Sequence, residues 1–263
     1  MKKWEQFELD CVAYLNQKYG MYARFTHKGG ADSTVPDILV ETRQGFCFYM
    51  EAKHSPAQCG QFVLLPDADT QTFYYSEKNE DEMNPQAEAI KEYMDQNFAV
   101  YSDKSRKRKK IAMPGDQEIF AAWIAQHYWN KGVRFFITNG FKIIPIGRFR
   151  ECFAISANYR VKRSGSNPLP KRDIPAVQEF LATQPYEIES FQTEGKKLFA
   201  VSDQPYHDSR FFWNGNEYRF AQQDGRYEIK KLSNTYNSNV IFSVKLNTDA
   251  PGLTDQEFIT ALM

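Results

Sequence analysis

Hydrophobic residues recur at three- and four-residue steps near the start of the chain, which predicts an amphipathic helix over residues 3–17. This apolar stripe consists of Trp4, Phe7, Cys11, Tyr14 and Leu15. Gly20 follows, where a helix stop is expected. Glu8 falls on the same stripe, a place where a solvated carboxylate is unusual. It is either a functional acid or a helix-boundary acid paired with Lys2 or Lys3.

A short aromatic-rich run predicts a buried strand over residues 46–53. Residues 42–45 form a connection suited to a hairpin turn with the segment before it. Side chains alternate between the two faces of a strand, so Glu51 and Lys53 point the same way. Antiparallel pairing of the two segments would place Asp37 beside Glu51.

The rest of the chain alternates between helical and strand-like patterns. Helices are predicted over 85–97, 116–131 and 254–262, and strands over 36–40, 133–138, 141–146, 197–201, 211–213, 217–220 and 240–246. Asn139-Gly140 is a dipeptide favoured in tight hairpin turns. These elements predict an α/β (α+β) fold, a mixed central sheet flanked by helices with a more β-rich C-terminal half. Residues 151–263 form either a second domain or a continuation of residues 1–150.

Composition places the chain among soluble globular proteins. Of its 263 residues 42% are hydrophobic and 25% charged, a balance that excludes disordered and collagen-like chains. No apolar run approaches the ~18–20 residues that cross a bilayer, and the N-terminus does not resemble a signal peptide. The four cysteines show neither CxxC nor zinc spacing, which favours free thiols in a reducing compartment. We therefore expect a cytoplasmic protein.

The formal net charge of zero hides an uneven distribution. Residues 101–175 carry 16 Lys and Arg against 5 Asp and Glu, whereas residues 64–100 carry 2 against 9. Such a basic block predicts a surface for a polyanion, because neutralising phosphates drives nucleic-acid binding. The run Lys104–Lys110 contributes six of these charges and is alternatively a solvated loop. A positive excess remains in the block without it.

Two carboxylates and a lysine on one hairpin suit phosphodiester hydrolysis. Asp37 and Glu51 offer the hard oxygen ligands that Mg²⁺ prefers, with positions left for water and phosphate. Lys53 offers a positive charge beside the attacking water or the transition-state phosphate. The alternative for Glu51 and Lys53 is a solvated, salt-bridging strand face.

These residues resemble the PD-(D/E)xK nuclease superfamily, whose motif here reads Pro36-Asp37, thirteen residues, then Glu51-Ala52-Lys53. The resemblance covers residues 1–65 and implies a restriction-endonuclease-like core. It also implies that Asp37 and Glu51 are metal ligands and Lys53 the catalytic lysine, with Glu8 as a further acid from the N-terminal helix.

Within that superfamily the chain looks most like a type II restriction endonuclease, since it is compact and has no GKS/T phosphate-binding motif. The resemblance implies Mg²⁺-dependent, sequence-specific cleavage of double-stranded DNA in a prokaryotic cytoplasm. A cognate DNA methyltransferase in the same host would be a functional partner. A palindromic target favours a homodimer, with a monomer cutting twice as the alternative. The rival functions are a same-fold nuclease for repair, junctions or modified DNA, and a non-catalytic DNA-binding protein.

Candidate DNA contacts come from three segments. Residues 159–166 combine side chains able to contact guanine edges or phosphates with small hydroxyl residues and a glycine. The candidates are Arg160, Lys162, Arg163, Ser164 and Ser166 there, Arg106 and Arg108 in the basic run, and Gln58 and Gln61 after the lysine. Residues 151–263 would supply most of the sequence reading.

Overall fold

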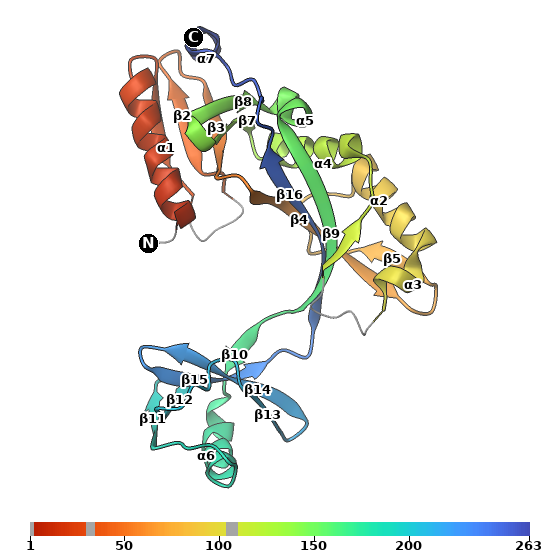
Figure 1. Ribbon diagram of the computed structural model, residues 1–263, viewed down its shortest axis with the longest axis vertical. Helices are drawn as coiled ribbons and strands as arrows, with labels where there is room; N and C mark the ends of the chain where they lie inside the picture. Colours follow the sequence, from red (N-terminus) through yellow and green to blue (C-terminus); the bar gives the residue numbers. More distant parts are fainter. Residues whose placement is uncertain (1–2, 30–34, 104–109) are drawn as a thin grey trace. The chain divides into compact units, whose positions relative to one another are not determined.

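The computed structural model describes residues 3–29, 35–103 and 110–263 (Figure 1). The chain divides into two compact units. Unit 1 comprises Met1–Arg160 and Ser238–Met263, and unit 2 comprises Val161–Asn237. Among the described residues, no helix is both long and apolar enough to cross a membrane.

This division differs from the expected boundary after residue 150. The strand β9 (Phe153–Arg163) belongs mostly to unit 1, and β16 (Tyr236–Leu246) brings the chain back to that unit. The return follows from strand pairing, because β16 lies between β4 and β9 in a sheet of unit 1. The C-terminal residues therefore share a unit with the N-terminal ones.

The first sheet of unit 1 has the strand order β1-β2-β3-β7-β8. Its strands are β1 (Ala23–His27), β2 (Ile38–Thr42), β3 (Cys47–Lys53), β7 (Val133–Thr138) and β8 (Lys142–Pro145). β3 and β7 run parallel, and the other neighbours are antiparallel. The predicted hairpin is confirmed as the β2–β3 pair, in which Ile38 lies opposite Met50.

Helix α1 (Lys3–Tyr19) packs against this sheet and confirms the predicted N-terminal helix. Its Cys11 and Leu15 are fully buried with Val40 of β2 and Phe258 of the C-terminal helix α7 (Asp255–Leu262). The apolar stripe thus faces the sheet, as the three- and four-residue spacing requires. Glu8 lies on that buried face.

The second sheet of unit 1 has the order β5-β4-β16-β9-β6. Its remaining strands are β4 (Ala57–Asp67), β5 (Thr72–Tyr75) and β6 (Lys110–Met113). Helix α4 (Gln117–Asn130) packs on it, because the Trp123 ring stacks on Phe242 with the ring centroids 4.6 Å apart. The other short elements of this unit are α2 (Pro85–Gln96), α3 (Phe98–Tyr101), η2 (Asn139–Phe141), η3 (Ile146–Arg148) and α5 (Phe149–Cys152).

Unit 2 is built on one sheet with the order β11-β12-β15-β14-β13, to which β10 adds by pairing with β15. Its elements are β10 (Ser166–Pro168), η4 (Lys171–Asp173), α6 (Ile174–Ala182), β11 (Ser190–Glu194), β12 (Lys197–Val201), β13 (Arg210–Trp213), β14 (Asn216–Gln223) and β15 (Arg226–Leu232). Val177 and Leu181 of α6 bury against Tyr218 and Ile229 of the sheet. The predicted mixed α+β fold with a β-rich C-terminal half is therefore confirmed.

Candidate active site

The β2–β3 hairpin brings Asp37, Glu51 and Lys53 together. Asp37 directly precedes β2, and the register Ile38–Met50 places it next to the end of β3. Its Oδ2 accepts a hydrogen bond of 2.9 Å from the Ala52 backbone nitrogen. The Lys53 ammonium donates to Glu51 Oε1 on the same face of β3. The expected neighbourhood of the three side chains is present.

Burial makes this cluster electrostatically unusual. Asp37 and Glu51 are only 8% and 6% exposed. Burial, and then the negative charge of Glu51, raise the pKa of Asp37 to about 7. Burial disfavours the charge of Lys53, but the Glu51 and Asp37 carboxylates outweigh it and raise the pKa of Lys53. With both acids ionised, two negative charges face one positive charge, so the cluster favours a further cation.

The donor set fits Mg²⁺ as far as the residues are described. Mg²⁺ is usually bound through one or two carboxylates while water and substrate phosphate complete its octahedron. Asp37 and Glu51 are such a pair. Within residues 3–29, 35–103 and 110–263, no group of three or more His, Cys, Asp or Glu side chains is arranged to hold a metal ion. With these two carboxylates as ligands, most positions around a bound Mg²⁺ would be left to water and phosphate.

Glu8 lies on the buried face of α1, 7% exposed. Its Oε2 lies 2.9 Å from Nε2 of His27 at the end of β1. The hydrogen-bonding partner is thus His27 instead of the expected Lys3, and Lys2 lies outside the described residues. Sequence reasoning missed His27, which forms no motif with the acids. The Glu8 carboxylate contributes to raising the pKa of Asp37, which indicates that the two acids interact.

The Lys53 side chain lies over the aromatic ring of Tyr128. Its ammonium lies 5.8 Å from the centre of the Tyr128 ring, and Tyr128 comes from α4. Tyr128 and the Cys59 thiol of β4 interact, since each contributes to the pKa of the other. Burial raises the pKa of Cys59 to about 12 and that of Tyr128 well above its usual value. Both groups therefore stay protonated and support the lysine without offering a nucleophile.

The end of β3 and the residues after it are held by Thr138, the last residue of β7, and by Asn139, which follows it. The Thr138 hydroxyl donates to the Lys53 carbonyl oxygen at 2.7 Å. The Asn139 side chain accepts from the Ser55 amide nitrogen at 2.8 Å and donates to the Ser55 carbonyl oxygen at 2.9 Å. These bonds fix the backbone on which Lys53 is carried.

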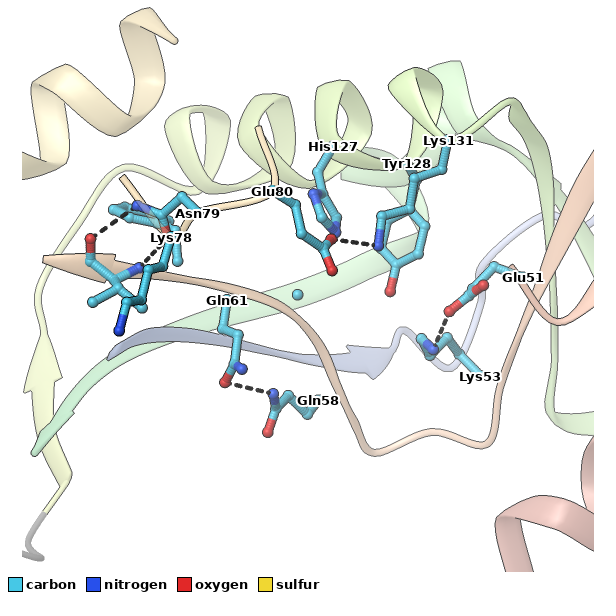
Figure 2. Close-up of a pocket in the computed structure, with 13 residues that line it drawn as sticks. Glu51, Lys53, Gln58, Gln61, Lys78, Asn79, Glu80, His127, Tyr128 and Lys131 are labelled. Atoms are coloured by element: carbon cyan, nitrogen blue, oxygen red, sulfur yellow. Dashed lines mark hydrogen bonds and ion pairs between the residues drawn. The ribbon is translucent and has the colours of Figure 1, made fainter. Parts of the chain in front are cut away.

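A pocket of about 340 Å³ opens beside the acid–lysine pair (Figure 2). Its lining includes Glu51, Lys53, Gln58, Gly60, Gln61, Lys78, Asn79, Glu80, His127, Tyr128 and Lys131. Gln58 donates to Gln61 at 3.2 Å, and Lys131 pairs with Glu80 at 2.9 Å. Both predicted glutamines therefore line the same pocket as Glu51 and Lys53. No sequence pattern pointed to Lys78 or Lys131, which lie far along the chain from the motif.

The candidates of residues 159–166 lie on β9 and just after it. Arg160 is half-buried and Lys162 is exposed. Arg163 is ion-paired with Glu217 and bonds the Tyr236 hydroxyl at 3.2 Å, so its guanidinium is already engaged.

The two serines and the two arginines of the basic run complete the predicted set. Ser164 donates to Asn237 Oδ1 at 3.0 Å. Ser166 pairs with Leu232 in the β10–β15 ladder. Arg106 and Arg108 lie outside the described residues.

The whole chain was compared with protein families, curated proteins and solved structures. No protein-family model matches it, and no curated protein matches it either. Among solved structures, the HhaI endonuclease in complex with DNA is similar, with 38% sequence identity and a TM-score of 0.79 over 99% of this chain and 99% of that chain. At this identity and coverage the likeness extends beyond the fold, and the chain belongs to the family of the HhaI endonuclease, with a restriction-endonuclease fold.

Proposed function

We propose that this protein is a Mg²⁺-dependent type II restriction endonuclease with a PD-(D/E)xK active site, which cuts double-stranded DNA at a specific sequence. The observation that carries the proposal is the convergence of Asp37, Glu51 and Lys53 on one buried hairpin. The HhaI endonuclease, of the same family, was solved in complex with DNA. That complex supports duplex DNA as the substrate.

Asp37 and Glu51 are the proposed metal ligands. When bound, Mg²⁺ supplies a Lewis acid that neutralises phosphate charge and makes water easier to deprotonate. The fold favours Mg²⁺ binding because it buries the Asp37 and Glu51 carboxylates close together. The raised pKa of Asp37 reflects its burial first and the nearby charge of Glu51 second, a free-energy cost that a bound cation would offset.

Lys53 is the proposed catalytic lysine. Glu51 holds its ammonium, and the Tyr128 ring lies beneath it. A fixed positive charge in a partly desolvated site stabilises the charge that develops on the phosphate oxygens during in-line attack. Thr138 and Asn139 keep the end of β3 in place and so limit the movement of this charge. Glu8, held by His27, is the proposed third acid, which orients groups around Asp37.

The pocket beside the site is the proposed place for the DNA backbone. Lys78 and Lys131 give it positive groups, and Gln58 and Gln61 give it neutral hydrogen-bonding groups. Lys131 is paired with Glu80, so DNA would have to share or replace that partner. The proposed contacts elsewhere are Arg160, Lys162, Ser164, Ser166, Arg106 and Arg108. Arg163 is a further candidate that would have to leave Glu217 to reach DNA.

The proposed biological setting is a restriction-modification system in a prokaryotic cytoplasm. A cognate DNA methyltransferase of the same host would protect the host's own sites. The enzyme would act on a palindrome as a homodimer or as a monomer that cuts the strands in turn. Sedimentation of the protein with a cleavable duplex distinguishes these two states.

The deciding experiment is digestion of phage DNA by the purified protein with Mg²⁺ or with EDTA, followed by sequencing of the fragment ends. We expect discrete ends that share one short sequence, only with Mg²⁺. Asp37→Asn and Lys53→Met should bind the same DNA without cutting it. Ends set by DNA structure or modification would instead indicate a repair-type nuclease. Binding without any cutting by the wild type would indicate a non-catalytic DNA-binding protein.

A further inference from the structure

Gly29 lies directly against the candidate active site. It follows β1, and its amide nitrogen donates to the Asp37 carbonyl oxygen at 3.0 Å. The neighbouring Lys28 amide donates to the same oxygen at 2.7 Å. Two backbone bonds therefore hold Gly29 against Asp37, outside any regular ladder.

A side chain at position 29 would enter the space between two carboxylates. A Cβ built on Gly29 would lie 2.7 Å from Asp37 Oδ1 and 3.0 Å from Glu8 Oε2. It would also lie 3.0 Å from the Asp37 Cα. Such contacts are shorter than carbon and oxygen atoms tolerate. The two acids thus face a common space that exists because residue 29 has no side chain.

The surrounding atoms cannot move aside freely. Asp37 Oδ2 is bonded to the Ala52 backbone, and Glu8 is held by His27. The third contact is with the Asp37 backbone, which a side-chain rotation cannot relieve. Any accommodation of a Cβ would therefore shift Asp37 relative to Glu51.

We propose that Gly29 is a positioning residue of the active site, which keeps open the space shared by the Glu8 and Asp37 carboxylates and thereby sets the affinity for Mg²⁺. This inference rests on the proposed function, because Asp37 is a metal ligand only under that proposal. Under this proposal Gly29 acts through Asp37 and Glu8. Displacement of groups that orient a metal ligand typically costs about 10- to 100-fold in metal affinity or activity.

The test compares Gly29→Ala with Gly147→Ala and the wild type. Gly147 is the matched control because a Cβ there would meet no described atom within 4 Å. Binding of Mg²⁺ is measured without DNA, as the rise in unfolding temperature during a Mg²⁺ titration. Cleavage of phage DNA is then measured over the same range of Mg²⁺ concentrations. Binding of that DNA is measured in EDTA.

We expect Gly29→Ala to require about 10- to 100-fold more Mg²⁺ in both the unfolding and the cleavage titrations. DNA binding in EDTA should be unchanged, and Gly147→Ala should match the wild type throughout. A Gly29→Ala protein with a wild-type Mg²⁺ response would overturn the inference. So would loss of its folded state or of its metal-free DNA binding, since the role would then be general and structural.

The two proposals fail in different ways. If the wild type cuts DNA and responds to Mg²⁺ while Gly29→Ala behaves identically, only the inference about Gly29 is wrong. If the wild type neither cuts nor responds to Mg²⁺, the proposed function is wrong and the inference falls with it.

Discussion

The Oδ2 atom of Asp37 lies 2.9 Å from the backbone nitrogen of Ala52. Ala52 is the residue between Glu51 and Lys53 in the sequence. This single bond ties the end of one strand to the acid-x-lysine segment of the next. It fixes the Asp37 carboxylate near Glu51, although their like charges repel. The consequences of the burial of Asp37 and of that repulsion are measurable without DNA.

The Asp37→Asn variant should change how stability depends on pH. The folded-state pKa of Asp37 is about 7, against an ordinary value of 3.8, so the folded protein binds this proton more tightly than the unfolded chain does. Wild-type stability therefore falls as pH rises from about 4 to 7, by roughly 2–4 kcal/mol from this group. Asparagine cannot ionise, so the Asp37→Asn variant should not lose this stability as pH rises. Urea unfolding in EDTA at pH 5 and pH 8 measures the difference.

In the same experiment Mg²⁺ should restore wild-type stability at pH 8 and much less at pH 5, where Asp37 is protonated. It should leave Asp37→Asn nearly unaffected. Equal pH dependence in the two proteins would show that Asp37 ionises normally.

The Lys53→Met variant should lose both cleavage and stability. Methionine keeps much of the side-chain volume but leaves Glu51 buried without its ion-pair partner. We expect cleavage to fall by at least about 100-fold and the free energy of unfolding at pH 8 to fall by about 3 kcal/mol. Lys18→Met is the control, because Lys18 lies on α1 in an exposed pair with Asp255. Its effect on stability should stay within about 1 kcal/mol. Normal cleavage by Lys53→Met would remove the lysine from the mechanism.

Local patterns predicted the part of the site that is close together in sequence. The hairpin from Asp37 to Lys53 is short, and its strand period alone puts Glu51 and Lys53 on one face. Helix α1 was equally predictable from the sequence, because the hydrophobic residues of its apolar stripe are regularly spaced. Glu8 stood out as the one acid on that stripe. The resemblance to PD-(D/E)xK nucleases depends on Asp37, Glu51 and Lys53, which the fold brings together.

Contacts between distant segments were beyond such patterns. β4 was not predicted because Gly60 and Pro66 interrupt its run, yet pairing with β16 stabilises it. The Glu8–His27 pair depends on how α1 crosses β1, and no spacing encodes that crossing. Helix α6 was hidden among strand-like segments, although Pro175 suits its first turn.

The Gly60→Ala variant should be strongly destabilised. Gly60 has a φ of +90°, which favours glycine, and an added Cβ would lie 2.7 Å from Cζ3 of the buried Trp123. Backbone strain and overpacking together should cost about 2–4 kcal/mol of unfolding free energy. Gly147→Ala, with open space around it, should cost little. Urea unfolding of the two variants makes the comparison, and equal stabilities would mean that β4 adjusts without cost.

The Glu8→Gln variant should cut DNA about 10- to 100-fold more slowly than the wild type while binding DNA normally in EDTA. Gln keeps the shape of the side chain but removes the charge that faces Asp37 and pairs with His27. Glu5→Gln, three residues earlier on the same helix, serves as the control and should cut at the wild-type rate. Initial cleavage rates across a Mg²⁺ titration measure the effect. An unchanged rate for Glu8→Gln would leave Glu8 as a structural acid.

Lys162 and Arg163 are neighbours on β9 with opposite expected roles, since adjacent side chains of a strand point to opposite faces. Lys162 is exposed, whereas Arg163 is engaged with Glu217 and Tyr236. If Lys162 contacts a phosphate, Lys162→Ala should weaken DNA binding and lower the slope of log affinity against log salt by about 0.9. Arg163→Ala should instead lower the free energy of unfolding by about 1–3 kcal/mol.

Anisotropy of a labelled duplex in EDTA over a range of KCl concentrations, with urea unfolding of each variant, separates the two roles of these residues. A reduced salt slope for Arg163→Ala at unchanged stability would reverse the assignment, because the guanidinium would then have to leave Glu217 for the DNA. An unchanged slope for Lys162→Ala would remove this part of β9 from the phosphate contacts. The measurement needs neither the target sequence nor cleavage, so it tests DNA binding independently of the metal site.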